Sequence, residues 1–574
     1  MSMNKNIARL AVTAGLTAAL SFGGVMVPVT MAFAEGAAAT DNSITITQNK
    51  DNGATTFKAY QIFKADVVDP TEAGATDKIV SNVKWADGVD ADAQKAIIEA
   101  INDKALKDDA SPEDVANWLT ENVHGTTKTT RVDKDSVLNK IAKVVKDKVK
   151  PTGNSFNAGT AFEPKNADDT PNTGYYLFLT DDASIGQLTE NKKSTGTSPI
   201  FAVVGGNPVV VTEKTSIPTV NKEVLEGAKW GNVSDSYIGE EVEYKLTGSV
   251  ADNIATFNKY HYEFHDTLSK GLEAAGESGN TPKDLHVYID NKGNQTEIMQ
   301  DDNDGYKVVL ERDSATKKEN LTITFTDLKT VKDKTGKTIK VDADSKVVVT
   351  YKATLTSDAE YTATGNTNDV ELVYSNNPMT SDTGTSTSKR VTDHVFRLNV
   401  TKVEKGKQEQ KLEATFQVKM TKEGDAPLKA DKWLTEDGGL TGDEKSAGKF
   451  KTAKDSGQVY IPGLVEGTYE ITECDTPAGY NTLAPFTITV NPTYDKNGNL
   501  TNLDVTSSDT VMVTPENTKD ATIPVTIQNK KGSGLPLTGL NGVTFTWIAG
   551  GAVLCIGVAH LIRSRKQAEE SEQE

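Results

Sequence analysis

The chain has 574 residues, of which 36% are hydrophobic and 25% charged, and its formal net charge at pH 7 is −19. This length exceeds what one hydrophobic core organises and predicts about three or four domains, while the composition excludes a collagen-like or wholly disordered chain. The acidic balance excludes nucleic acid as a partner, because binding phosphates requires clustered Lys and Arg. Only two cysteines occur, Cys474 and Cys555, so the disulfides that staple most small exported domains are missing.

The first 34 residues have the pattern of a secretory signal peptide. Lys5 and Arg9 give a positive start, a stretch of apolar and small residues follows, and Ala32-Phe33-Ala34 supplies the small residues that precede a cleavage site. A retained membrane anchor is the alternative, but the cleavage pattern favours removal. The mature chain is therefore expected to begin at Glu35 and to be secreted.

Residues 35–213 are expected to form a first domain in which strands surround a helical insert. Apolar residues recur near helical spacing in three segments, Ala91–Asp103, Pro112–Asn122 and Val137–Lys148. Ser111 before Pro112 is a good helix start, with Ser as the N-cap and Pro in the first turn. Strands are predicted at Ser43–Gln48, Thr56–Phe63, Gly174–Thr180 and Ile200–Val204.

Residues 214–393 and 394–534 are expected to form two further domains made of short alternating strands. Polar segments such as Asp290–Asn294 and Asp333–Lys337 are typical of hairpin connections, and Ser381–Ser388 is predicted to be a flexible loop. The predicted fold is therefore mostly β, with three tandem β-sandwiches of immunoglobulin-like or transthyretin-like type.

The period of two in strands places polar residues where the core of the third domain should be. Lys402, Glu473 and Asn529 each continue the apolar row of a separate strand. Because an unpartnered buried charge costs several kcal/mol, the three side chains are expected to meet. A satisfied buried ion pair with a neighbouring amide is the simplest interpretation.

The second domain repeats the arrangement. Lys222 shares a face with Val220 and Val224, Asp266 continues the apolar row that begins at Tyr260, and Asn376 ends the row that begins at Val370. The same parity selects Asn376 over Asn377.

A chemical reaction follows from these two triads. Burial lowers the pKa of a lysine toward the nucleophilic amine and raises the pKa of an acid so that it can donate a proton. The amine can then attack the Asn side-chain carbonyl while the acid shuttles protons and ammonia leaves. The predicted products are isopeptide bonds Lys222–Asn376 and Lys402–Asn529, with Asp266 and Glu473 as the acids.

Residues 535–574 combine a short motif, an apolar segment and a basic tail. Leu535, Pro536, Leu537, Thr538 and Gly539 precede an apolar run over 543–562, and Arg563, Arg565 and Lys566 follow it. A helix of this length spans a bilayer core of roughly 30 Å, with the basic tail on the cytoplasmic side. The proline keeps the motif extended. The whole resembles the cell-wall sorting signal of sortase substrates, which implies cleavage between Thr538 and Gly539.

The resemblance covers nearly the whole chain. Residues 402–529, with Tyr469–Glu473 followed by Pro477–Tyr480, resemble the collagen-adhesin B-type (transthyretin-like) domain of Gram-positive surface proteins. The segments His261–Leu272 and Tyr374–Pro378 resemble the isopeptide-forming middle domain of sortase-assembled backbone pilins. Residues 57–63 and 174–177 look like the first domain of that family.

This resemblance implies a partner set and a polymerisation chemistry. In such pilins a sortase joins the Thr of one subunit to a lysine at the junction of the first and second domains of the next. Here Thr538 would be the donor and Lys214 the acceptor; an ordinary surface lysine in a linker is the alternative interpretation of Lys214. The implied partners are pilus and housekeeping sortases, identical subunits, accessory pilins, peptidoglycan and host surface ligands, with the product on the cell wall.

Two functions stay open at this point. One is a structural shaft subunit of a covalent pilus, and the other is a monomeric wall-anchored adhesin that binds a host glycan or matrix protein. An extracellular enzyme has no supporting motif, and no cofactor is expected. His261 and His265, four apart on a predicted strand, and the turn Asp301–Gly305 are not expected to hold a metal.

Overall fold

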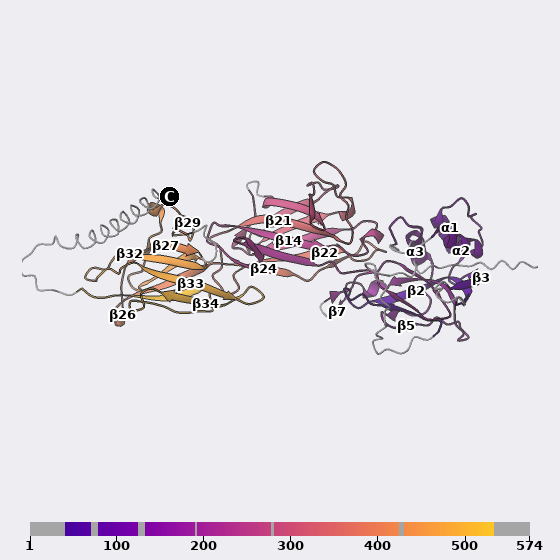
Figure 1. Cartoon of the computed structure of the whole chain (residues 1–574), viewed down its shortest axis with the longest axis horizontal. Coiled ribbons are helices and arrows are strands. Elements are labelled where there is room, and N and C mark those ends of the chain that lie inside the picture. Colours follow the sequence, from indigo (N-terminus) through magenta and orange to yellow (C-terminus); the bar gives the residue numbers. More distant parts are fainter. Residues whose placement is uncertain are drawn as a thin grey trace, which may run out of the picture.

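The computed structural model describes residues 41–69, 78–123, 132–189, 192–276, 280–423 and 430–532. The predicted signal peptide and sorting signal lie outside these ranges. Within them, no helix is long and apolar enough to cross a membrane, and no group of three His, Cys, Asp or Glu side chains is arranged to hold a metal. The described chain is mostly β, as predicted, and its sheets follow one another along an elongated molecule (Figure 1).

The first group of strands, here called the N-terminal unit, runs from β1 to β10. It contains a five-stranded sheet of order β3-β2-β6-β9 with β4 on β2, a three-stranded sheet of order β10-β1-β5, and the hairpin β7-β8. The strands are β1 (Ile44–Thr47), β2 (Thr56–Val68), β3 (Ile79–Trp85), β4 (Phe156–Asn157), β5 (Ala161–Phe162), β6 (Gly174–Thr180), β7 (Leu188–Thr189), β8 (Lys192–Lys193), β9 (Ile200–Val204) and β10 (Val209–Thr212).

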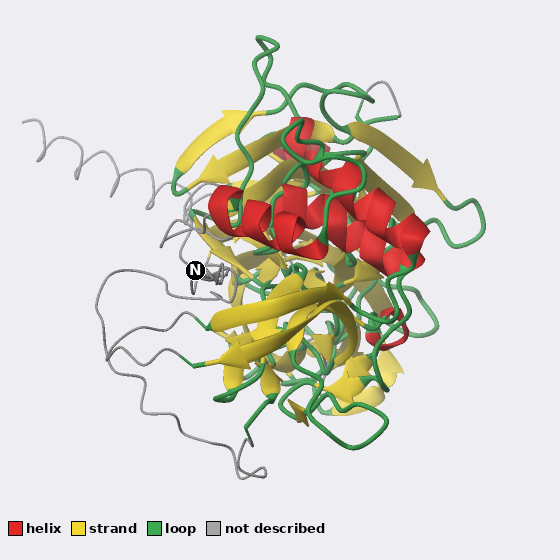
Figure 2. Cartoon of the chain, turned by 90° about the vertical axis from the view of Figure 1, so that its right-hand side faces the viewer, coloured by secondary structure: helices red, strands yellow, loops and turns green. Residues whose placement is uncertain are grey.

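The predicted helical insert is confirmed as α1 (Ala91–Ile101), α2 (Pro112–Asn122) and α3 (Val137–Lys148). The helices bury their apolar faces in one cluster with β2, β3, β6 and β9, and Figure 2 views them from this end of the molecule. Helix α2 begins as expected, because Ser111 and Asp114 form a capping box. Helix α1 ends two residues before its predicted end at Asp103, since Asn102 adopts a left-handed backbone (φ 53°) that closes the helix.

The middle unit is a sandwich of two seven-stranded sheets. One has the order β12-β11-β14-β21-β17-β18 with β16 on β21, and the other has the order β13-β24-β22-β15-β20-β19 with β23 on β22. The strands are β11 (Val220–Glu226), β12 (Lys229–Gly231), β13 (Val233–Asp235), β14 (Glu241–Ser249), β15 (Tyr262–Leu268), β16 (Leu272–Glu273), β17 (Lys283–Asn291), β18 (Asn294–Glu297), β19 (Lys307–Arg312), β20 (Glu319–Phe325), β21 (Ser345–Leu355), β22 (Asn366–Ser375), β23 (Thr383–Thr385) and β24 (Lys389–His394).

The C-terminal unit also has two sheets. One has the order β26-β25-β36-β35 with β31 on β25, and the other has the order β29-β28-β27-β32-β33-β34 with β30 on β27. The strands are β25 (Phe396–Glu404), β26 (Lys407–Lys411), β27 (Thr415–Glu423), β28 (Lys432–Leu434), β29 (Leu440–Thr441), β30 (Phe450–Lys451), β31 (Gln458–Leu464), β32 (Gly467–Asp475), β33 (Phe486–Tyr494), β34 (Leu500–Ser507), β35 (Val513–Pro515) and β36 (Thr522–Asn529).

Two turn predictions have different outcomes. The hairpin at Asp290–Asn294 joins β17 to β18, with Lys292 and Gly293 in the left-handed region that a tight turn requires. The predicted loop Ser381–Ser388 is wrong in part, because Thr383–Thr385 form β23 and pair with the end of β22. Exposed edge strands of polar residues carry no apolar alternation, and their pairing depends on the neighbouring backbone.

The middle and C-terminal units are joined by one residue and by a network of hydrogen bonds. Strand β24 ends at His394 and β25 begins at Phe396. The buried His394 Nε2 lies 2.8 Å from the carbonyl oxygen of Gly498. Further along the joint, the Glu466 backbone N–H donates to Asp235 Oδ2 at 2.6 Å. The two units are therefore held together as well as linked.

Asp393 lies at the centre of this joint and is fully buried. Its Oδ1 accepts hydrogen bonds from the Ser234 and Ser236 hydroxyls at 2.8 and 2.9 Å, while Oδ2 has no partner among the described residues. Burial raises the pKa of Asp393 from 3.8 to about 7, and the nearby carboxylates of Glu240 and Glu226 act in the same direction.

Asp393 makes the stability of the molecule depend on pH. A carboxyl with a raised folded-state pKa stabilises the fold fully below its unfolded pKa, and this contribution is lost as pH rises through about 7. We expect the thermal midpoint to fall between about pH 5 and pH 7.5, where ordinary carboxylates are already ionised. In Asp393→Asn this fall of the thermal midpoint should be much smaller. Thermal unfolding followed by circular dichroism at each pH measures the difference. Identical pH profiles for the two proteins would contradict the assignment.

Candidate crosslinking sites

The C-terminal unit brings Lys402, Glu473 and Asn529 together in its core. Strands β25 and β36 pair in parallel, so that Lys402 and Asn529 lie on adjacent strands, while β32 presents Glu473 from the facing sheet. Lys402 Nζ lies 3.0 Å from Glu473 Oε1, and Asn529 Nδ2 donates to both Glu473 oxygens at 2.9 and 3.0 Å. All three residues are buried, as their strand parity predicted.

The surroundings of this cluster favour a reactive amine. Burial lowers the pKa of Lys402 to about 8, although the carboxylate of Glu473 opposes the shift. The ion pair with Glu473 is the only polar contact described for Lys402 Nζ, which otherwise faces the ring of Phe416 at 5.2 Å. Asn529 Oδ1 has no hydrogen-bond partner within the described part of the chain. The carboxylate thus touches both the nucleophilic nitrogen and the amide nitrogen that would leave.

The middle unit contains a similar buried cluster built from both of its sheets. Lys222 on β11 forms an ion pair with Asp266 Oδ1 on β15 of the facing sheet. The Tyr351 hydroxyl, from β21, donates to Asp266 Oδ2 at 2.7 Å and accepts from Asn368 Nδ2 at 2.7 Å. Lys222 Nζ lies 3.4 Å from the same hydroxyl oxygen. A lysine, an acid and an asparagine therefore meet here too.

Asn376 is not the asparagine of this cluster: the predicted position of Asn376 beside Lys222 is wrong, and Asn368 lies there instead. In the antiparallel pairing of β15 with β22, Asp266 lies opposite Val370. Asn376 follows the end of β22, six residues beyond Val370, and at about 3.3 Å per residue this is roughly 20 Å along the strand. Asn376 lies instead against the N-terminal unit, where its backbone carbonyl oxygen accepts from the Gly196 N–H at 2.7 Å.

The electrostatics of the middle cluster resemble those of the other. Burial lowers the pKa of Lys222 to about 8, against the pull of Asp266, and burial raises the pKa of Asp266. Asn368 Oδ1, like Asn529 Oδ1, has no partner among the residues described. In the described chain, Lys222–Asp266 and Lys402–Glu473 are the ion pairs in which neither side chain is exposed to solvent at all.

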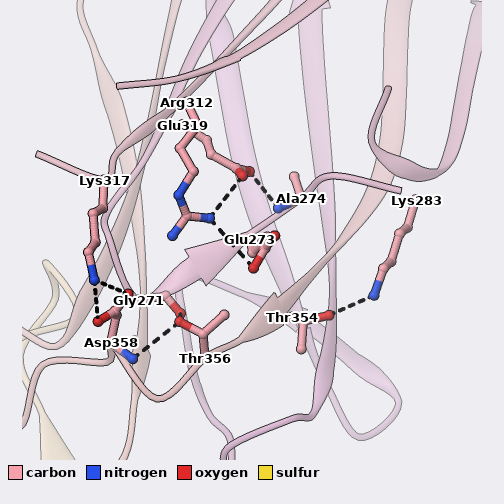
Figure 3. Close-up of polar contacts among 10 residues, drawn as sticks. All are labelled: Gly271, Glu273, Ala274, Lys283, Arg312, Lys317, Glu319, Thr354, Thr356 and Asp358. Carbon is pink, nitrogen blue, oxygen red and sulfur yellow. Dashed lines mark hydrogen bonds and ion pairs between the residues drawn. The ribbon is translucent and has the colours of Figure 1, made fainter. Parts of the chain in front are cut away.

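Burial of an acid alone does not produce such a site, as Glu319 shows. Its carboxylate accepts from the Ala274 N–H at 2.6 Å and pairs with Arg312 Nη1 at 3.3 Å (Figure 3). Burial raises the pKa of Glu319, but its basic partner is a partly exposed guanidinium. Arginine stays protonated and cannot act as a nucleophile, so this contact is structural.

The N-terminal unit has no comparable cluster among its described residues, since none of its ion pairs joins two fully buried side chains. Its most deeply buried acid is Glu213, which accepts from Asn52 Nδ2 at 3.1 Å and from the Thr55 hydroxyl. The adjacent Lys214, two residues after the end of β10, is half-buried, and its backbone N–H donates to Thr197 Oγ1 at 2.7 Å. Leu535, Pro536, Thr538 and Gly539 lie outside the described residues.

The two buried charges of the C-terminal cluster should depend strongly on each other. In an Asn529→Ala background, where no crosslink can form, Glu473→Ala leaves Lys402 uncompensated and should cost about 3–5 kcal/mol. Lys402→Met should cost a similar amount, whereas the double variant should cost much less than the sum of the two. Urea unfolding of the four proteins measures this coupling, and additive costs would contradict a mutually dependent pair.

Comparisons with known proteins find one family model and several solved structures that are similar to this chain. No curated protein matches the chain. Residues 396–508 match the family model SpaA, described as a prealbumin-like fold domain. The T6 backbone pilin of Streptococcus pyogenes is 16% identical with a TM-score of 0.48, over 86% of this chain and 100% of that one.

Two further solved structures are of the same kind. The Corynebacterium diphtheriae major pilin SpaA is 14% identical with a TM-score of 0.41, over 85% of this chain and 100% of that one. The group B streptococcus pilus 2b backbone protein is 22% identical with a TM-score of 0.37, over 56% and 99%. Each of these three structures is a backbone or major pilin, and the similarity covers 86%, 85% and 56% of this chain, respectively.

Proposed function

We propose that the chain is a structural shaft subunit of a covalent surface pilus, strengthened by two self-formed Lys–Asn isopeptide bonds. The observation that carries this proposal is the pair of fully buried Lys–acid–Asn clusters, one in each of two successive sandwiches. Burying an ion pair costs desolvation energy even when the charges are paired, and a reaction that converts the lysine and the amide into a neutral bond removes the lysine charge.

The bonds proposed are Lys402–Asn529 and Lys222–Asn368. In each, the neutral Nζ attacks the amide carbon, the acid takes a proton from Nζ and a proton reaches the departing Nδ2, so that ammonia leaves. No cofactor takes part in this reaction. Each bond closes a long loop of the chain, and a permanent closure limits the unfolded ensemble much as a disulfide does.

Polymerisation would join a donor residue of one subunit to an acceptor residue of the next. The proposed donor, Thr538, follows the C-terminal unit, whereas the proposed acceptor, Lys214, lies between the N-terminal and middle units. Pilus and housekeeping sortases, accessory pilins and peptidoglycan are the partners of this function, and the secreted product is attached to the cell wall.

The crosslinks predict a mass deficit. The intact mass of the purified mature chain should fall below its sequence mass by two molecules of ammonia, and Asp266→Ala and Glu473→Ala should each restore one. Asn368→Ala should restore one as well, because Asn368 lies within the buried cluster. Asn376→Ala is the matched control and should keep both losses. A wild-type chain with its full sequence mass would show that neither crosslink forms.

If the subunits are covalently polymerised, cell-wall extracts should contain a series of bands of increasing mass. Boiled and reduced cell-wall extracts of the wild type should give a high-mass ladder on an immunoblot, because covalent links survive both treatments. The ladder should collapse to monomer in a Lys214→Ala strain. A surviving ladder would move the acceptor to another lysine, and a monomer-sized band in both strains would favour the wall-anchored adhesin instead.

A further inference from the structure

The middle cluster contains a fourth buried polar group that the predicted reaction does not use. Tyr351 on β21 is fully buried, and its ring stacks on that of Tyr244 with centroids 5.5 Å apart. Its hydroxyl lies between the three reacting residues, within 3.4 Å of Lys222 Nζ and at 2.7 Å from both Asp266 Oδ2 and Asn368 Nδ2. A packing role would account for the ring but not for this placement of the hydroxyl.

The two clusters each place an acid near a lysine and an asparagine amide, but their acids differ in length. In the C-terminal unit the glutamate Glu473 contacts the lysine and the amide directly. In the middle unit the acid is an aspartate, one methylene shorter, and the hydrogen bond described for Asn368 Nδ2 goes to Tyr351 rather than to Asp266. The tyrosine hydroxyl fills the gap between the short acid and the amide.

We propose that Tyr351 is a further catalytic residue of the middle unit, relaying a proton between Asp266 and the leaving nitrogen of Asn368. This proposal rests on the isopeptide reaction proposed above. As the Lys222 Nζ–carbon bond forms, one proton moves from Nζ to Asp266. The Tyr351 hydroxyl then turns, gives its proton to Nδ2 and takes the proton held by Asp266. The carbon–Nδ2 bond breaks and ammonia leaves, so the acid and the tyrosine are both regenerated.

The test removes the hydroxyl and keeps the ring. In the full mature chain, Tyr351→Phe should form the Lys222–Asn368 bond about a hundredfold or more slowly, within the range that general acid–base groups contribute. A time course of intact mass on freshly synthesised protein measures this rate. The Lys402–Asn529 bond serves as an internal reference, and peptide mapping assigns each ammonia loss to its unit.

Tyr244→Phe is the matched control. Tyr244 is also fully buried and belongs to the same stack, but its hydroxyl has no hydrogen-bond partner among the described residues. This variant should lose both ammonia molecules at the wild-type rate. If it slowed the middle crosslink as much as Tyr351→Phe, the effect would belong to packing, and the relay would be overturned.

A longer acid should replace the relay. The double variant Tyr351→Phe with Asp266→Glu should recover the middle crosslink, since a glutamate can reach the amide directly, as Glu473 does. If Tyr351→Phe alone fails to fold, limited proteolysis will reveal it, and this double variant then decides the question. A folded double variant without the bond would contradict the relay.

The two proposals fail in different ways. A wild-type chain that never loses ammonia overturns the isopeptide reaction itself, whatever Tyr351 does. A wild type that loses two ammonia molecules, together with a Tyr351→Phe chain that loses both at the same rate, overturns only the relay.

Discussion

The structure depends on a lysine and a carboxylate held together where water cannot reach them. Each pair is costly to bury, and neither partner alone would be tolerated in these cores. Both sandwiches are nevertheless arranged around such a pair, with an asparagine amide whose carbonyl oxygen has no partner among the described residues. Burial lowers the lysine pKa and so prepares the amine for attack. The same desolvation that costs the fold stability would favour the proposed covalent crosslink.

Much of this arrangement could be predicted from the residues alone. Helices α2 and α3 have their predicted bounds, because a Ser N-cap and a regular apolar stripe are local signals. Lys402, Glu473 and Asn529 meet because each continues the inward parity of a regular strand. Parity works wherever the strand alternation is unbroken, since a buried polar residue then stands out against its apolar neighbours.

The errors come from information that parity does not contain. Asn368 and Asn376 have the same parity along the sequence, and only the register between β15 and β22 decides which of them lies near Asp266. Tyr351 was missed because a tyrosine in an apolar row is usually core, and nothing in the sequence tells which buried hydroxyl will face an acid. The nearest available signal was the length of the acid, since an aspartate reaches less far than a glutamate.

The parallel pairing of β25 with β36 has a mechanical consequence. The chain enters the C-terminal unit at one end of this strand pair and leaves it at the other, so a pull on both termini loads the connecting hydrogen bonds in shear. With the Lys402–Asn529 bond in place, tension would cross from one strand to the other near their far ends. Within the unit, only residues 396–402 and Asn529 would then lie on the loaded path, and the rest of the sandwich would carry little tension. If the proposed bond forms, this unit would resist stretching through a covalent path, whatever the stability of the fold around it.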